Sequence, residues 1–167
     1  MSYFRELSSY RESILSKLIS NPNIVQAVGN NKSDFLSNPD TKINPMDLLY
    51  KNIYPYRYVC DPAIEQSTFI TFYFFGKSNL SMDNDAFKYT YIGFDIYCHR
   101  DIIRTDEGCL RFDFIISEID EMIHNQKLGE SITKASLINH TDFSLYEGKW
   151  QGAQLSYSIV DKKLSCR

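Results

Sequence analysis

A run of strict alternation between residues 87 and 99 constrains the fold more than any other feature. One side of an extended chain here carries Ile92, Phe94, Ile96 and Cys98, and the other side carries Tyr89, Tyr91, Gly93, Asp95 and Tyr97. Successive side chains on a β-strand point to opposite faces, so this pattern predicts a strand with one apolar face and one tyrosine-rich face.

Three further segments have strand character. Residues 68–75 are apolar on both faces, which predicts a central or doubly covered strand. Residues 76–86 are rich in Ser, Asn and Asp, and we expect them to form a long exposed loop that joins 68–75 to 87–99 as a hairpin. Residues 150–162 alternate again, whereas 132–143 are irregular, as in an edge strand with a bulge.

Helical periodicity marks two segments. The first twenty residues approximate one apolar face, and residues 112–123 carry an apolar stripe that we expect to end at Gly129. The sequence therefore predicts a single α+β domain over residues 1–167. Its expected architecture is an antiparallel four-stranded sheet, made of two β-hairpins, with the N-terminal helix and the central amphipathic helix packed on one face.

Residues 29–66 form an irregular arm within this domain. Turn residues dominate its first half, and a Tyr- and Pro-rich extended segment, residues 53–62, follows. Long segments without strong elements are usually functional or disordered. The apolar and aromatic residues within 53–59 favour an ordered arm that lies on its own subunit or on a neighbouring one.

Composition excludes several classes of protein. The formal net charge is −3, with Lys and Arg scattered along the chain, which argues against a general nucleic-acid or anionic-membrane binder. No signal peptide or membrane-length apolar run is present, so the default compartment is the cytosol. The four cysteines are widely spaced and are expected to be reduced thiols, with Cys98 in the core.

Candidate catalytic and metal-binding groups are weak. Cys98 and His99 are neighbours on a strand and point to opposite faces, so they cannot share one ion. The segment 83–85 begins like a calcium loop but lacks the required Gly and Glu, and the acidic residues at 118–121 fit a solvated helix face. Nucleophile and phosphate-binding motifs are absent. We therefore expect no enzyme activity, no cofactor, no metal and no catalytic residues.

The unusual surplus is aromatic, with twelve Tyr and eleven Phe beside one Trp. Half-buried tyrosines on a sheet are common, and that reading stays open. The alternative is a subunit interface, where Tyr is enriched. Its candidate residues are Tyr54, Tyr56, Arg57 and Tyr58 in the arm, with Tyr89, Tyr91 and Tyr97 on the strand.

The order of elements resembles the tail-terminator, or tail-completion, proteins of long-tailed bacteriophages. The resemblance is carried by residues 89–97, 110–128 and 151–160 and has no invariant motif. It implies a virion protein, assembled in the host cytoplasm, that forms a hexameric ring, caps the tail tube and docks to the neck. DNA would pass through the lumen only as cargo, no membrane is involved, and no catalytic residues carry over.

Other classes remain open from the sequence. The long arm departs from the tail-terminator pattern, and another neck, connector or baseplate subunit would use similar parts. A non-viral ligand-binding domain or enzyme would need a pocket near the arm, around Arg57 or His99. A monomeric adaptor would keep the fold and bind one partner through the tyrosine face.

Overall fold

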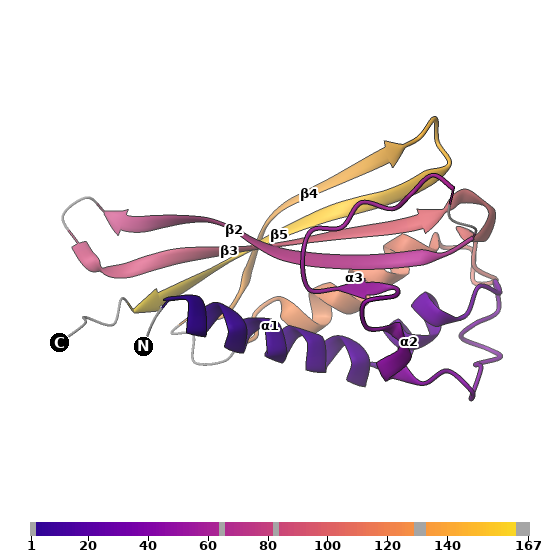
Figure 1. Ribbon diagram of the computed structural model, residues 1–167, viewed down its shortest axis with the longest axis horizontal. Coiled ribbons are helices and arrows are strands. Elements are labelled where there is room, and N and C mark those ends of the chain that lie inside the picture. The colour runs from indigo at the N-terminus through magenta and orange to yellow at the C-terminus, as the bar shows by residue number, and fades with distance from the viewer. Residues whose placement is uncertain (1–2, 64–65, 82–83, 129–132, 163–167) are drawn as a thin grey trace.

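The computed structural model describes residues 3–63, 66–81, 84–128 and 133–162 as a five-stranded sheet with helices packed on one face (Figure 1). The helices are α1 (Tyr3–Ser20), α2 (Pro22–Gly29) and α3 (Arg111–Ile123), with short 3-10 helices η1 (Pro45–Leu48) and η2 (Arg100–Ile102). The strands are β1 (Ile53–Tyr54), β2 (Thr68–Ser81), β3 (Asn84–His99), β4 (Ser136–Leu145) and β5 (Trp150–Lys162), in the spatial order β1-β2-β3-β5-β4.

Both predicted hairpins are present. β2 pairs antiparallel with β3, β4 pairs antiparallel with β5, and the two hairpins join through an antiparallel β3–β5 pairing. The prediction of four strands in a purely antiparallel sheet is wrong in one respect, because β1 adds a fifth strand parallel to β2. Asn52 fixes this short pairing: its side chain donates to the carbonyl of Thr68 (2.9 Å), and its own carbonyl accepts the N–H of Ile70 (2.9 Å).

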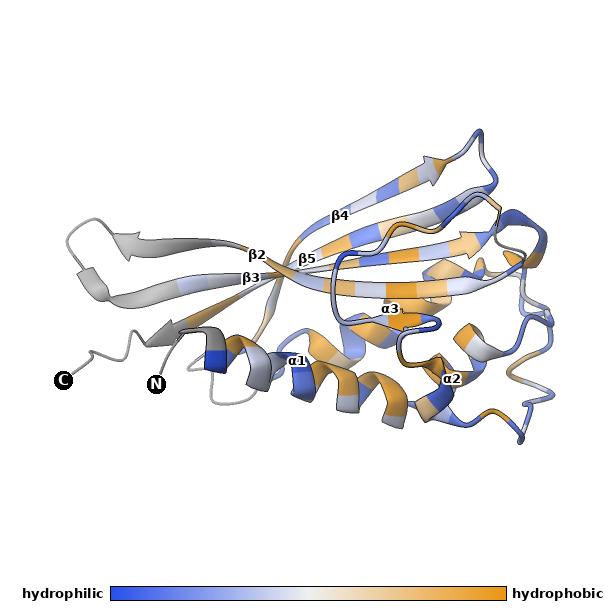
Figure 2. Cartoon of the chain, in the orientation of Figure 1, coloured by the Kyte–Doolittle hydropathy of each residue, from blue (hydrophilic) through white to orange (hydrophobic). Residues whose placement is uncertain are grey.

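The main core lies between the sheet and the helices. As their alternation predicts, β3 contributes its even-numbered apolar residues, such as Ile96, and β5 contributes its odd-numbered ones, such as Leu155. α1 and α3 turn their hydrophobic residues toward the sheet (Figure 2). Ile14 of α1 and Ile115 of α3 are fully inaccessible members of this core. Each fully buried aliphatic side chain contributes roughly 1.5–3 kcal/mol, so this layer supplies most of the stability.

Several element boundaries differ from the sequence prediction, among them β4, which was predicted within 132–143 and covers Ser136–Leu145. Two of the differences have a clear cause in the backbone. Residues 76–81 continue β2 instead of forming a loop, because Gly76 adopts a positive φ of 65° and absorbs a register shift between Phe75 and Lys77. α3 ends at Ile123 and not at Gly129, which lies outside the described residues. Asn125 takes a φ of 57° just after the helix, and Asn tolerates this left-handed conformation well enough to end a helix without Gly.

Candidate functional site: the outer sheet face and the arm

The second half of the arm, residues 54–62, lies on the sheet face opposite the helices, here called the outer face, whereas Phe35 and Leu48 of its first half belong to the main core beside the helices. The start of this second half is held by Arg11 of α1, whose Nε donates to the carbonyl of Pro55 (2.8 Å). Its middle is held by Tyr146, whose hydroxyl donates to the carbonyl of Cys60 (3.0 Å), and Lys149 donates to the carbonyl of Pro62. The arm therefore makes defined contacts with α1 and with the turn between β4 and β5.

A second, smaller core lies beneath the arm. Its buried members are Tyr54, Cys60, Phe69, Tyr97 and Trp150. The rings of Tyr54 and Tyr58 stack with centroids 4.0 Å apart, and Tyr97 meets Phe143 edge-on at 5.1 Å. Of the predicted interface residues, Tyr54 and Tyr97 are thus buried within the subunit, and Tyr58 is half-buried against them.

A buried carboxylate, Asp95, organises the middle of the outer face. Its Oδ1 accepts hydrogen bonds from Tyr73 (3.1 Å) and from the side-chain amide of Gln154 (2.7 Å). Nε of Arg57 lies 3.8 Å from its Oδ2, and the guanidinium sits over the Tyr73 ring at 5.0 Å. Arg57 therefore holds the arm to the sheet, although its side chain is 66% exposed.

Burial changes the titration of these tyrosines, and we expect a visible alkaline transition. The pKa of Tyr54 and the pKa of Tyr73 are both raised from 10.0 to about 12, chiefly by burial, with the nearby Asp95 charge as the second cause at Tyr73. Above pH ~10 the unfolded chain releases these protons while the folded chain keeps them, so stability is complete below pH ~10 and falls as the pH approaches 12. Urea-denaturation midpoints measured from pH 8 to 12, alongside tyrosinate absorbance, test this; a midpoint that stays constant up to pH 12 contradicts it.

Three exposed or half-exposed aromatic residues form what we call the aromatic ladder: Phe75, Tyr91 and Tyr89. The Phe75 and Tyr91 rings stack at 5.7 Å, and Tyr89 and Tyr91 stack at 6.1 Å with an interplanar angle of 13°. Phe75, which is 40% exposed, was not among the predicted interface residues. The face on which Phe75 lies could have been predicted from the sequence, because Phe75 is two residues from Tyr73 on the same strand and so points to the same side. In the structure Phe75 pairs with Tyr91 across the hairpin.

A second exposed aromatic pair marks the arm beside β1. Tyr50 and Tyr56 are 63% and 47% exposed, and their rings stack at 6.5 Å. Together with the exposed neighbour Lys51, they are here called the arm tip. Tyr50 was also missed by the sequence prediction. Its backbone has a φ of 58°, a conformation that costs a bulky residue roughly 1–2 kcal/mol.

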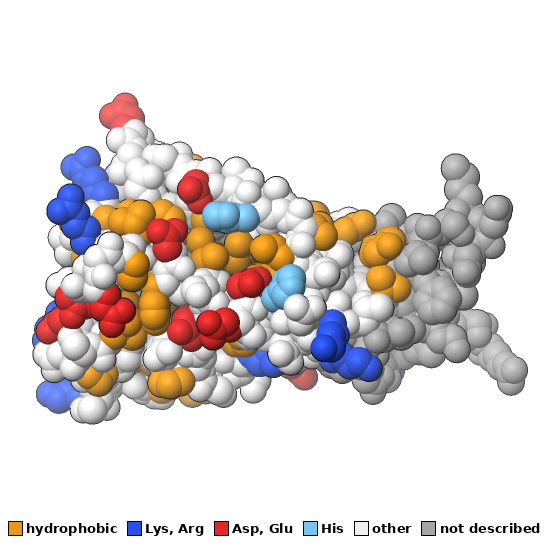
Figure 3. All heavy atoms as spheres, turned by 180° about the vertical axis from the view of Figure 1, so that it is seen from behind, with side chains coloured by type: hydrophobic (Ala, Val, Ile, Leu, Met, Phe, Trp, Pro, Cys, Tyr) orange, Lys and Arg blue, Asp and Glu red, His pale blue; other side chains and the backbone are white. Residues whose placement is uncertain are grey.

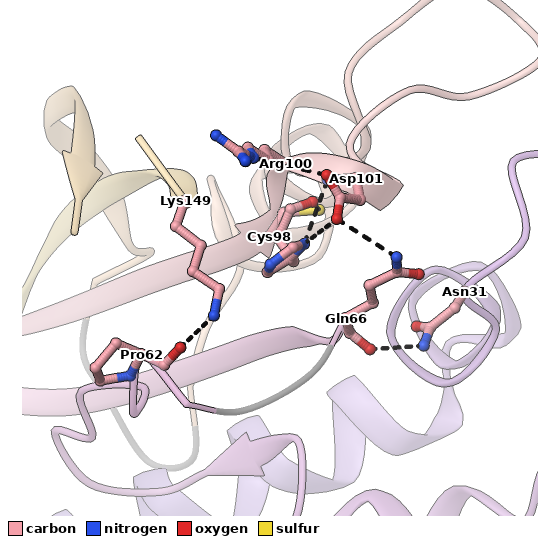
Figure 4. A network of polar contacts seen from close by, with 8 residues as sticks. Asn31, Pro62, Gln66, Cys98, Arg100, Asp101 and Lys149 are labelled. Atoms are coloured by element: carbon pink, nitrogen blue, oxygen red, sulfur yellow. Dashed lines mark hydrogen bonds and ion pairs between the residues drawn. The ribbon is translucent and has the colours of Figure 1, made fainter. Parts of the chain in front are cut away.

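A polar cleft of about 820 Å³ lies where β3 ends and β5 begins, and His99 lines it. Figure 4 shows the contacts that tie its walls together. Asn31 donates to the carbonyl of Gln66 (2.8 Å), and the Gln66 amide reaches Oδ2 of Asp101 (3.5 Å). The Asp101 N–H donates to Nδ1 of His99 (3.3 Å). These hydrogen bonds join the loop after α2, the end of the arm and the end of β3. We therefore assign the polar residues of the cleft a role in holding these segments together.

Across residues 3–63, 66–81, 84–128 and 133–162, no three His, Cys, Asp or Glu side chains gather as a metal site requires. None of the helices in the described part of the chain has the length and hydrophobicity of a membrane span.

The fold and these surfaces define a class: an α+β protein whose outer sheet face and arm carry exposed and half-exposed aromatic side chains. A family model described as YomW matches residues 21–159, which is most of the chain. The chain therefore belongs to the YomW family, a family of phage-derived, SPbeta-prophage-like proteins, and it is phage-associated. No curated protein matches it. The sequence resemblance to phage proteins is confirmed at this level.

Proposed function

We propose that this protein is a structural virion protein, a tail terminator that forms a ring at the head–tail junction of a long-tailed phage. In this role it caps the tail tube, docks to the neck and lets DNA pass through its lumen. The observation that carries the proposal is the aromatic ladder on the outer face. Membership of a phage-derived family supports it.

The ladder has the properties of a protein contact surface. Tyr and Phe offer large contact areas with few rotatable bonds, and Tyr is enriched where binding energy concentrates. The ladder also stands on a rigid support, because Phe75 and Tyr91 are paired residues of two long strands. A stacked, partly exposed aromatic row on such a base needs no rearrangement before it binds, which lowers the cost of association.

The arm supplies a second surface on the same subunit. A closed ring needs two different complementary patches on each copy, since each subunit contacts one neighbour with one patch and the other neighbour with the second. The arm tip and the aromatic ladder belong to different segments of the chain, residues 50–56 and residues 75–91. This arrangement requires no catalytic group.

We expect the purified protein to form a ring-sized species whose mass is near six times the 19.5 kDa subunit mass, the copy number that the resemblance implies. Phe75→Ala/Tyr91→Ala is expected to weaken its assembly or its binding to neighbouring tail proteins by about 30-fold, because truncating a central aromatic costs about 2 kcal/mol or more. Light scattering across a concentration series, with negative-stain electron microscopy of the particles, measures this.

Leu110→Ala is the matched control, because Leu110 is an exposed apolar residue at the start of α3, outside both surfaces. It is expected to leave the assembly unchanged. A wild-type protein that remains monomeric at every concentration and binds no tail component contradicts the proposed function. A Phe75→Ala/Tyr91→Ala variant that assembles like the wild type shows that the ladder is not the contact surface.

A further inference from the structure

A groove between α3 and β4 has the make-up of a docking site. It encloses about 480 Å³, with Ile116, Leu137 and Leu155 among its lining residues. Carboxylates of Asp113 and Glu121 stand at its exposed margin. Figure 3 shows the face on which α3 lies, where hydrophobic side chains form a band interspersed with acidic groups and histidines, while Lys and Arg lie toward its ends. An apolar floor with a polar rim is the usual anatomy of an interface.

The strand beside this groove is an open edge. β4 ends the sheet, and its residues are mostly exposed along its length. Proteins usually protect such edges with Lys, Pro, short strands or bulges. β4 has one register shift, between Leu137 and Asn139, but it spans ten residues and contains neither Lys nor Pro. The groove and the edge together form one continuous surface that is suited to a covering partner.

The charge of the groove specifies the chemistry of that partner. Asp113 and His140 line the groove, and burial together with the charge of nearby Asp142 raises the pKa of Asp113. Nε2 of His140 lies 3.1 Å from Oδ1 of Asp142, and a protonated His140 offsets part of this negative charge. A segment that carries a cation next to apolar or aromatic groups would complement both the floor and the rim.

The arm tip offers this chemistry at the opposite edge of the same sheet. β1 is one edge of the sheet and β4 is the other. Tyr50 and Tyr56 present two stacked rings beside β1, and the Lys51 ammonium is exposed next to them. The backbone of Tyr50, with its φ of 58°, is strained, and strain of this kind clusters at binding sites.

We propose that the α3–β4 groove is the docking site for the arm tip of a second copy of this chain. The inference deepens the proposed function and rests on it. It replaces the aromatic ladder by the groove as the ring partner of the arm tip, and the ladder is then left to contact the neighbouring tail proteins. Tyr50 and Tyr56 enter the groove over Ile116 and Leu137, and Lys51 meets Asp113 and Glu121. Because donor and acceptor surfaces lie at opposite edges of one sheet, the contact is head-to-tail, and repetition of such a contact closes a ring when the rotation permits.

Charge reversal tests this pairing. Glu121→Lys and Lys51→Glu are each expected to weaken self-association at least tenfold, because each places like charges together. The chain that carries both changes is expected to regain most of the wild-type affinity. Glu12→Lys, an equal charge change on the exposed side of α1, is the control and should have no effect. Sedimentation equilibrium at two salt concentrations gives the association constants.

A substitution at Tyr50 separates contact from folding. Tyr50→Gly relieves the left-handed backbone conformation, so thermal stability is expected to stay constant or rise while self-association falls at least tenfold. Loss of both stability and association together would instead indicate a structural role for Tyr50 and would count against the docking.

The outcomes distinguish this inference from the proposed function. Rings that persist in Glu121→Lys and Lys51→Glu, yet dissociate in Phe75→Ala/Tyr91→Ala, overturn the groove proposal and leave the proposed function standing. Two single variants that weaken association without recovery in the double variant also overturn it, since the two charges then do not meet. A wild-type chain that never self-associates overturns the ring and the groove contact together.

Discussion

Replacing Arg111 with methionine is expected to lower the free energy of unfolding by about 4–5 kcal/mol, the upper range for a single substitution. Arg111 is fully buried at the start of α3. Its guanidinium donates to the carbonyls of Ile102 (2.8 Å), Ala27 (2.8 Å), Asn30 (2.5 Å) and Lys32 (2.6 Å). Methionine keeps the apolar stem and removes every one of these donors.

The size of this effect follows from what remains after the substitution. Four carbonyl groups lose a charged donor in a region that water reaches poorly, and each buried unsatisfied group costs about 1–3 kcal/mol. The guanidinium also stands 4.5 Å from the centre of the Phe35 ring and near the carbonyl end of α2, where a cation is favourable. Burial lowers the pKa of Arg111, yet the residue stays charged, so these contacts persist at all ordinary pH values.

Urea denaturation followed by circular dichroism measures the loss. A typical domain has a free energy of unfolding of about 5–15 kcal/mol, and Arg111→Met removes a large share of it. A variant that is unfolded without urea therefore also agrees with the assigned role. Arg111→Lys keeps the charge, but a single ammonium cannot bond all four carbonyls that the planar guanidinium reaches. The free energy of unfolding is expected to fall by an intermediate amount, about 2–3 kcal/mol. An Arg111→Met protein within about 1 kcal/mol of the wild type would contradict the assigned role.

Gly152→Ala is expected to destabilise the protein by about 3 kcal/mol or more, since overpacking against backbone is costly. A Cβ at Gly152 would lie 1.8 Å from the carbonyl oxygen of Ile96, on the neighbouring strand β3. No side-chain rotation can relieve that overlap. β3 and β5 must separate locally, and these strands join the two hairpins of the sheet.

Gly93→Ala is the matched control for Gly152→Ala. A Cβ at Gly93 would lie 2.7 Å from the Tyr73 ring, which is a side chain and can move aside. Its expected cost is about 1 kcal/mol, although movement of Tyr73 also disturbs its hydrogen bond to Asp95. Thermal and urea unfolding of both variants test the comparison, and equal losses would show that the contact with Ile96 is not what limits position 152.

Strands with one buried face were predictable because their burial alternates. β5 runs from Trp150 to Lys162, the range that its pattern predicts, and its odd-numbered apolar positions enter the main core. β1 could not be predicted, since two residues are too few to show a period. Its pairing depends on hydrogen bonds from Asn52 to β2, which the sequence does not encode as a pattern.

The sequence could not show which tyrosines of the candidate site are exposed. Parity along β3 places Tyr91 and Tyr97 on the same face, but it does not say what lies above each of them. Phe143 and the arm cover Tyr97, which is 4% exposed, whereas Tyr91 stacks in the half-exposed ladder. The residues that cover Tyr97 are distant from it in the sequence. Only the folded structure therefore distinguishes buried tyrosines from exposed ones.

The sequence also contains an indication that Arg111 is buried. It precedes Ile115 by four residues, so it lies on the apolar stripe of α3 and not on its polar face. A charged residue on a buried stripe predicts a partner for that charge. The partners are carbonyl groups of residues 27–32 and 102, which no pattern of side chains could have indicated.

The two faces of the sheet are covered very unequally. In the described part of the chain, the helices bury a large hydrophobic cluster on one side, while the cluster under the arm has five buried hydrophobic members. Local opening free energies follow the apolar contacts that must be broken, so the arm layer opens at a lower free energy than the helical layer. Amide protons of the arm itself are therefore expected to exchange without global unfolding. In the proposed ring, a chain built this way would adjust its arm layer to a neighbouring copy while the helical layer keeps its shape.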